Sequence, residues 1–161
     1  MQVMGKPILI VEDSRTYAVM LRSTLERLGR VVEHVMTLNG AMAMLNARVY
    51  DVVLFDLFLP DSDGIPGLER VLEITDAPVI VLTALEDEST AREALRAGAD
   101  DYIFKGALDQ TILWRTLGRA AERQFFRLKQ RERFAIKPDR TAVKRCAPLS
   151  CVTTTFLSTR T

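Results

Sequence analysis

Short apolar runs alternate with amphipathic segments along most of the chain. Five apolar runs are long enough for buried strands: residues 7–11, 30–35, 51–55, 77–83 and 101–104. Apolar residues recur at helical spacing in residues 14–29, 39–48, 67–74, 86–98 and 109–134. Strands that are apolar throughout and alternate with helices are typical of a parallel sheet covered on both faces. We therefore predict an α/β fold of five strand–helix units, with an open, doubly wound sheet and an extended last helix.

Charge is distributed unevenly along the chain, although the net charge is only +1. Residues 1–108 contain 10 Lys and Arg against 17 Asp and Glu, whereas residues 109–161 contain 12 against 4. A basic carboxyl-terminal part can bind an acidic surface, or it can be an arginine-rich helix that faces water. The sequence leaves both interpretations open.

The sequence shows no sign of a zinc site or a membrane segment. The two cysteines, Cys146 and Cys151, make neither a disulfide framework nor a zinc-binding set, and no histidine lies near them. The amino-terminal segment has no long apolar run followed by a cleavage site, and no run of 18 apolar residues occurs. These features predict a cytoplasmic protein with free thiols and no contact with a membrane.

Polar side chains follow several of the predicted strands at the point where each strand ends. Glu12 and Asp13 follow the first strand and Asp56 follows the third, while Thr83 ends the fourth and Lys105 follows the fifth. Because the carboxyl ends of parallel strands meet at one edge of a sheet, we expect these side chains to gather there. Each of them alone could be a helix cap or a solvated loop residue. Three acids in one crevice, however, serve no structural need.

Three clustered carboxylates require compensating positive charge. Two of them ~5 Å apart repel by roughly 3 kcal/mol at an effective dielectric constant of about 20. Lys105 supplies one charge, and a hard divalent ion such as Mg²⁺ suits the remaining oxygens. A carboxylate can attack phosphorus to form an aspartyl phosphate, while metal, ammonium and hydroxyl neutralise the phosphoryl oxygens. The residue set therefore matches phosphoryl transfer to a carboxylate.

The sequence resembles the receiver domain of two-component response regulators. The matching segments, in that family's order and spacing, are ILIVEDS (8–14), VVLFDLFLPDSDG (52–64), VIVLTA (79–84) and DYIFKG (101–106). The resemblance covers about residues 6–124. It implies a flavodoxin-like (βα)5 fold with strand order 2-1-3-4-5. It also implies a phosphorylation-dependent signalling switch, and no enzyme activity beyond self-phosphorylation and self-dephosphorylation.

The resemblance also implies roles for individual residues. Asp56 would be the phosphoacceptor, charged by a histidine kinase or a phosphotransfer protein. Thr83 and Lys105 would contact the phosphoryl group, and Tyr102 would be the switch aromatic whose ring turns inward as Thr83 shifts. The implied ligands of Mg²⁺ are Glu12, Asp13, Asp56 and the backbone carbonyl of Phe58.

Two features depart from the family's usual pattern. Gly106 follows Lys105 where the family usually has a proline, often after a cis peptide bond. A cis bond before a residue other than proline costs about 3 kcal/mol or more, so we expect a trans bond here. Phe58 and Leu85, near the family's rate-tuning positions, are both bulky and apolar. We hypothesise that they hinder the attacking water and lengthen the lifetime of the phosphoryl group.

The predicted domain organisation has three parts. We expect a receiver domain over residues 5–124, a helical extension over 125–136 and a disordered tail or linker remnant over 137–161. The extension is either a signalling helix that leads to an output domain or a homodimer partner, or a basic extension without such a role. Ile112, Leu113 and Leu117 are expected to pack on the sheet, and Phe125, Phe126 and Leu128 to lie beyond it.

Other function classes fit the sequence less well. An aspartyl-phosphate phosphohydrolase needs a second acid two residues after its nucleophile, where Phe58 stands. A flavodoxin-like cofactor binder needs glycines and hydroxyls after the first strand, where residues 12–14 read EDS. Two alternatives stay open: a receiver-like interaction module not controlled by phosphorylation, and the amino-terminal fragment of a larger regulator with an enzymatic output domain. No DNA-binding module is readable, so direct DNA binding is not predicted.

Overall fold

Five parallel strands form one sheet in the order β2-β1-β3-β4-β5, as predicted. The computed structural model describes residues 5–62, 64–84 and 88–135, so the predictions for Leu85, for the two cysteines and for residues 137–161 lie outside it. The strands are β1 (Ile8–Val11), β2 (Val32–Val35), β3 (Val52–Asp56), β4 (Val79–Thr83) and β5 (Asp101–Phe104). The helices are α1 (Arg15–Arg27), α2 (Leu38–Ala47), α3 (Ile65–Ile74), α4 (Glu88–Ala97) and α5 (Gln110–Ala135), with a 3-10 turn, η1 (Lys105–Ala107), before α5.

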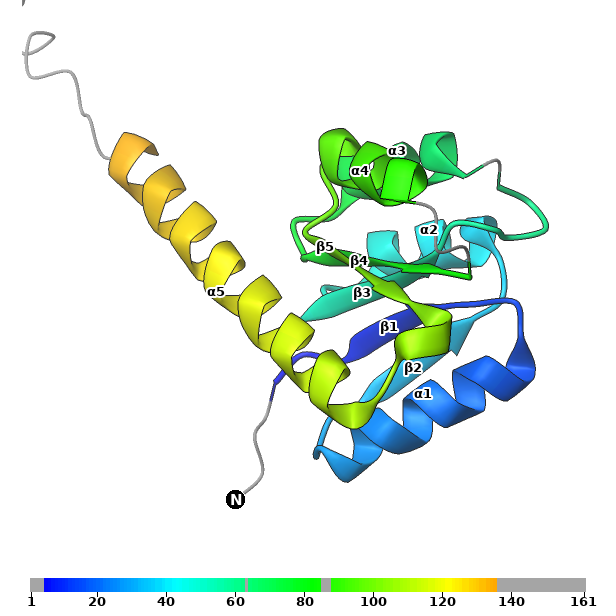
Figure 1. The fold of residues 1–161 in the computed structure, drawn as a ribbon. Helices are drawn as coiled ribbons and strands as arrows, with labels where there is room; N and C mark the ends of the chain where they lie inside the picture. The colour runs from blue at the N-terminus through cyan, green and yellow to red at the C-terminus, as the bar shows by residue number, and fades with distance from the viewer. Residues whose placement is uncertain (1–4, 63, 85–87, 136–161) are drawn as a thin grey trace, which may run out of the picture.

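Helices cover both faces of the sheet, and successive strand residues point to opposite faces (Figure 1). In β1, Leu9 and Val11 pack in a cluster with α2, α3 and α4, whereas Ile8 and Ile10 pack in a second cluster with α1 and α5. All four side chains are buried, and burial of such a side chain is worth about 1.5–3 kcal/mol. The strand is therefore held from both sides, and the residues that follow it are fixed at the rim of the sheet.

Several element ends differ from the predicted ones by one or two residues. Helix α3 begins at Ile65 rather than at residue 67, because Pro66 fits the first turn, where a backbone N–H is not needed. Gly64 precedes it with φ 69°, a conformation that favours glycine. Asp56 is the last residue of β3 rather than the first residue after it. Ser14 caps α1, because its hydroxyl accepts a hydrogen bond from the backbone N–H of Tyr17 in the first turn.

Helix α5 packs its first turns on the sheet and then runs past the sheet edge (Figure 1). Leu113 and Leu117 are buried in the cluster shared with α1, as predicted. The prediction for Ile112 is wrong, because its side chain is 37% exposed. Ile112 precedes the buried Leu113 by one residue, which turns its side chain by about 100° around the helix axis. Phe125 and Phe126 are exposed, as expected for the part of the helix beyond the sheet.

Four arginines at a spacing of four residues line one side of α5 and contact acidic residues of the domain. The spacing places them above one another on a single helix face. Arg127 lies 2.7 Å from Asp100, and Arg131 lies 2.6 Å from Asp76. The other two contacts are those of Arg119 and Arg123 with Asp101, at 3.1 and 3.6 Å. This side of the basic helix is therefore tied to the domain as far as Arg131. Within the described residues, the structure contains no helix with the length and apolarity that a bilayer crossing requires.

Candidate functional site

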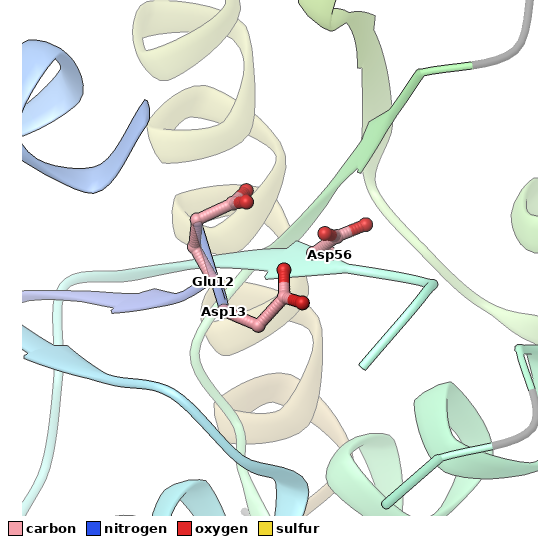
Figure 2. Close-up of side chains that lie close together, drawn as sticks. All are labelled: Glu12, Asp13 and Asp56. Atoms are coloured by element: carbon pink, nitrogen blue, oxygen red, sulfur yellow. The ribbon is translucent and has the colours of Figure 1, made fainter. Parts of the chain in front are cut away.

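Three carboxylates meet at the carboxyl ends of β1 and β3. The two strands are neighbours in the sheet, and Val11 pairs with Phe55, so the residues after these two face each other. Glu12 and Asp13 follow β1, and Asp56 ends β3 (Figure 2). One oxygen of each carboxylate lies within 4.8 Å of the others. The sequence-based expectation that the three acids gather at this rim is therefore met by the geometry.

Lys105 connects two of the three acids. Its Nζ donates to Asp56 Oδ2 at 2.7 Å and lies 2.9 and 2.7 Å from the two oxygens of Glu12. Both acids are buried, whereas Asp13 is exposed. The second oxygen of Asp56 accepts the backbone N–H of Phe58 at 3.0 Å. Buried charges are tolerated when they are paired and hydrogen-bonded, and both conditions hold for Asp56.

The site is electrostatically strained, because it carries three acids against one lysine. Burial raises the pKa of Glu12, its hydrogen bond to Lys105 lowers it, and the Asp56 charge raises it again, so the pKa lies above its usual value. Burial lowers the pKa of Lys105, but the hydrogen bonds to Asp56 and Glu12 outweigh this effect and raise the pKa overall. The lysine is therefore firmly charged, whereas Glu12 holds its proton more readily than an exposed glutamate does.

Three further residues contact Glu12 or Lys105. The backbone N–H of Ser14 donates to Glu12 Oε1 at 3.2 Å. His34, on β2, places Nε2 2.7 Å from the Glu12 carbonyl oxygen, which can only accept a hydrogen bond. Tyr17, on α1, lies with its ring against the Lys105 ammonium, 4.9 Å from Nζ to the ring centroid. Sequence reasoning missed His34 and Tyr17, because one reads as a strand residue and the other as an apolar position of a helix.

The remaining predicted residues lie on the neighbouring strand ends. Thr83 is the buried last residue of β4 and pairs with Phe104, which directly precedes Lys105. Tyr102 is partly buried on the edge strand β5, and its ring packs edge-on against Phe104 at a centroid distance of 5.4 Å. The Phe58 side chain is 50% exposed beside the acids. The structure contains no cis peptide bond among the described residues, so the bond before Gly106 is trans, as expected.

The donor set is suited to a hard divalent cation. The cluster that could hold a metal ion consists of Glu12, Asp13 and Asp56, all of which offer carboxylate oxygens. Mg²⁺ prefers such oxygens, whereas zinc sites use histidine and cysteine. Lys105 compensates only one of the three negative charges. A divalent ion would neutralise the remaining two.

The sequence comparison identifies the family. The model of the response regulator receiver domain matches residues 8–116. The KDP operon transcriptional regulatory protein KdpE of Escherichia coli is 41% identical over 98 residues, which are 61% of this chain and 44% of that protein. The transcriptional regulatory protein ResD of Bacillus subtilis is 32% identical over 122 residues, which are 74% of this chain and 51% of that protein. The chain thus spans about half the length of these relatives.

Solved structures agree with this result. A response regulator receiver domain protein (CheY-like) from Methanospirillum hungatei aligns with a TM-score of 0.70 and 27% identity, and the alignment covers 76% of this chain and 98% of that one. The receiver domain of the Francisella response regulator 1452 aligns with a TM-score of 0.66 and 27% identity, over 74% of this chain and 98% of that one. The strand order, the acidic rim and the matched residues agree, and the chain belongs to the response regulator receiver domain family of two-component signalling.

Proposed function

We propose that the chain is a phosphorylation-dependent switch that accepts a phosphoryl group on Asp56. One observation carries the proposal: Asp56 is a buried carboxylate at a strand end that accepts a hydrogen bond from Lys105 at 2.7 Å and lies beside two further acids. A structural ion pair would need one acid and one base, whereas this site gathers more negative charge than its lysine balances. Membership of the receiver family supports the same role.

The proposed reaction needs little covalent chemistry from the protein. A carboxylate oxygen of Asp56 attacks the phosphorus of a phosphohistidine, and the phosphorus–nitrogen bond breaks. Its electron pair returns to the imidazole, whose nitrogen takes up a proton. Lys105 already contacts Asp56, so its ammonium is in place to offset charge on the phosphoryl oxygens. We assign the Thr83 hydroxyl to the same task, and the switch movement to Thr83 and Tyr102.

We propose Mg²⁺ as the cofactor, because the donor set fits it. Glu12, Asp13, Asp56 and the backbone carbonyl of Phe58 would hold the ion. When bound, Mg²⁺ neutralises charge on the transferring phosphoryl group. In the absence of the ion, the positive charge of Lys105 offsets the repulsion between Glu12 and Asp56. We expect metal binding to shift this balance rather than to create the site.

The proposed partners follow from the same chemistry. A histidine kinase or a phosphotransfer protein would supply the phosphoryl group, and an output domain or target protein, whose identity the site does not specify, would respond to it. Formation of a homodimer is one possible response to phosphorylation. We expect neither direct DNA binding nor catalysis on other substrates. The alternatives are an interaction module not controlled by phosphorylation and a fragment of a larger regulator with an enzymatic output domain.

We retain the proposed division into a receiver domain over residues 5–124 and a helical extension over 125–136. The contacts of Arg127 with Asp100 and of Arg131 with Asp76 support an extension held in a fixed direction against the domain. Such a helix can transmit a movement of the domain to whatever it contacts. This favours the signalling helix over a basic extension without a role.

The test is phosphorylation by a small phosphodonor with Mg²⁺, followed by the mass of the intact protein. We expect one added phosphoryl group on the wild type and none on Asp56→Asn. Asp76→Asn, which removes an exposed acid outside the site that contacts Arg131, is the matched control and should be phosphorylated like the wild type. Absence of any adduct on the wild type, with several donors and with Mg²⁺ present, would refute the proposal.

A further inference from the structure

A tyrosine of α1 completes the surroundings of the site lysine. Lys105 Nζ lies over the ring of Tyr17, 4.9 Å from its centroid, which is within the range of a cation–π interaction. The two residues are 88 positions apart in the chain and come from α1 and η1. Tyr17 is half-buried and packs against the apolar cluster beneath α1 and α5. Its ring is therefore held by the core and not by the lysine.

The ring of Tyr17 contacts the ammonium in addition to the two acids. An ammonium has three N–H donors and no acceptor. Glu12 and Asp56 take two directions, at 2.9 and 2.7 Å. Nζ also lies over the electron-rich face of the Tyr17 ring. The Lys105 side chain is accordingly only 17% exposed, although it is long and lies near the surface.

We propose that Tyr17 is a positioning residue, which holds the Lys105 ammonium at Asp56 through its ring face and so speeds phosphoryl transfer. The inference rests on the proposed function of Asp56. A lysine on a flexible four-carbon stem gives up rotamer freedom when it is fixed, and the ring offsets part of that cost. Without the ring, the ammonium spends more time in solvent and less beside the incoming phosphoryl oxygens. Tyr17 itself touches neither the donor nor the reacting atoms.

The hydroxyl of Tyr17 provides a way to separate the ring from the rest of the side chain. It is buried and has no hydrogen-bond partner within the described residues. A buried polar group without a partner destabilises the folded protein, so Tyr17→Phe removes this unfavourable hydroxyl and keeps the ring. Tyr17→Leu keeps an apolar side chain of moderate size but removes the aromatic face. The two variants therefore differ in the one property that the proposal invokes.

The experiment compares initial rates of phosphorylation by acetyl phosphate with Mg²⁺ in the wild type, Tyr17→Phe and Tyr17→Leu. A cation–π contact of this kind predicts a rate roughly three- to thirty-fold lower for Tyr17→Leu and a rate within about twofold of wild type for Tyr17→Phe. If Tyr17→Leu does not fold, Tyr17→Met, whose longer side chain fills more of the same space, takes its place. A Leu or Met variant as fast as the wild type would overturn the proposal. So would a Phe variant as slow as the Leu variant, because it would place the role on the hydroxyl.

A spectroscopic readout keeps this test independent of the phosphorylation chemistry. The ring current of Tyr17 should displace the NMR signals of the Lys105 ε-methylene from their ordinary position. We expect the displacement to persist in Tyr17→Phe and to vanish in Tyr17→Leu. If the wild type shows the displacement but is never phosphorylated, the function proposed for Asp56 fails and the contact stands. If no displacement is present in the wild type, the contact itself is refuted.

Discussion

Replacement of Lys105 by methionine tests the charge balance of the site without touching an acid. The ammonium lies 2.7 Å from an oxygen of Glu12 and 2.7 Å from one of Asp56. At an effective dielectric constant of about 20, each contact corresponds to roughly 6 kcal/mol of attraction, most of which offsets the desolvation of the ions. Removal of one partner from a buried ion pair costs about 3–5 kcal/mol, because the remaining charge is left buried. We expect a loss of stability in this range without metal.

The pH dependence of this loss has a definite sign. Lys105 lowers the pKa of Glu12, so its removal raises that pKa further above the usual value. A carboxyl group whose pKa is raised by folding destabilises the folded state increasingly as the pH rises above the unfolded pKa, and the penalty is complete above the folded pKa and absent below the unfolded one. The stability difference between the variant and the wild type should therefore be largest around neutral pH and should shrink toward acid pH. Because the pKa of Lys105 itself is raised in the folded protein, the difference should also shrink at strongly alkaline pH, where the wild-type lysine loses its proton.

Urea denaturation in EDTA, and again with Mg²⁺, measures these effects. A ligand present at 100 times its dissociation constant adds about 2.7 kcal/mol, and the variant, which lacks the competing ammonium, should gain more from Mg²⁺ than the wild type does. Lys6→Met removes an exposed lysine outside the site and serves as the control. A loss below about 1 kcal/mol in EDTA, with equal stabilisation of both proteins by Mg²⁺, would refute the charge balance described for the site.

Three further changes have defined outcomes. The carboxylate of Asp61 accepts hydrogen bonds from two backbone N–H groups at the start of α2, and these bonds, chiefly that from residue 39, lower its pKa. Asp61→Ala should therefore lower the free energy of unfolding by about 1 kcal/mol, measured by urea denaturation. This difference should be present above the unfolded pKa and should be lost in acid. Arg127→Ala leaves the buried Asp100 without its arginine and should lower the free energy of unfolding by about 1–2 kcal/mol. Amide hydrogen exchange in the last turns of α5 should become faster. Unchanged exchange would contradict the ion pairs described for that helix. Phe58→Asn should shorten the lifetime of the phosphoryl group, measured by loss of the mass adduct after the donor is removed, if the exposed ring hinders water.

The order of elements and the place of the acids could be predicted because both depend on local patterns. Strands that are apolar throughout, such as residues 52–55, read as buried, and parallel topology alone then brings Glu12 and Asp56 to one rim. Helix ends were less predictable. The helix predicted from residue 67 begins at Ile65, because Pro66 is tolerated in a first turn.

Contacts between distant side chains could not be predicted from the sequence. Tyr17 recurs at helical spacing with core residues, and that pattern does not reveal that its ring also faces Lys105. The basic character of α5 was visible, but the partners of its arginines were not. Asp76, for instance, follows α3 outside any periodic segment and meets Arg131 only because α5 passes over it. Side-chain direction and helix placement decide such contacts, and neither is a property of local sequence.

The identity of the modified residue is the central claim, and it can be measured directly. After incubation with acetyl phosphate and Mg²⁺, hydride reduction converts an acyl phosphate on an aspartate to homoserine, which peptide mass mapping locates. We predict homoserine at position 56 and nowhere else in the wild type, and none in Asp56→Asn. Reduction at Asp13 or Glu12 in place of Asp56, or an intact phosphoryl adduct that resists reduction, would contradict the account.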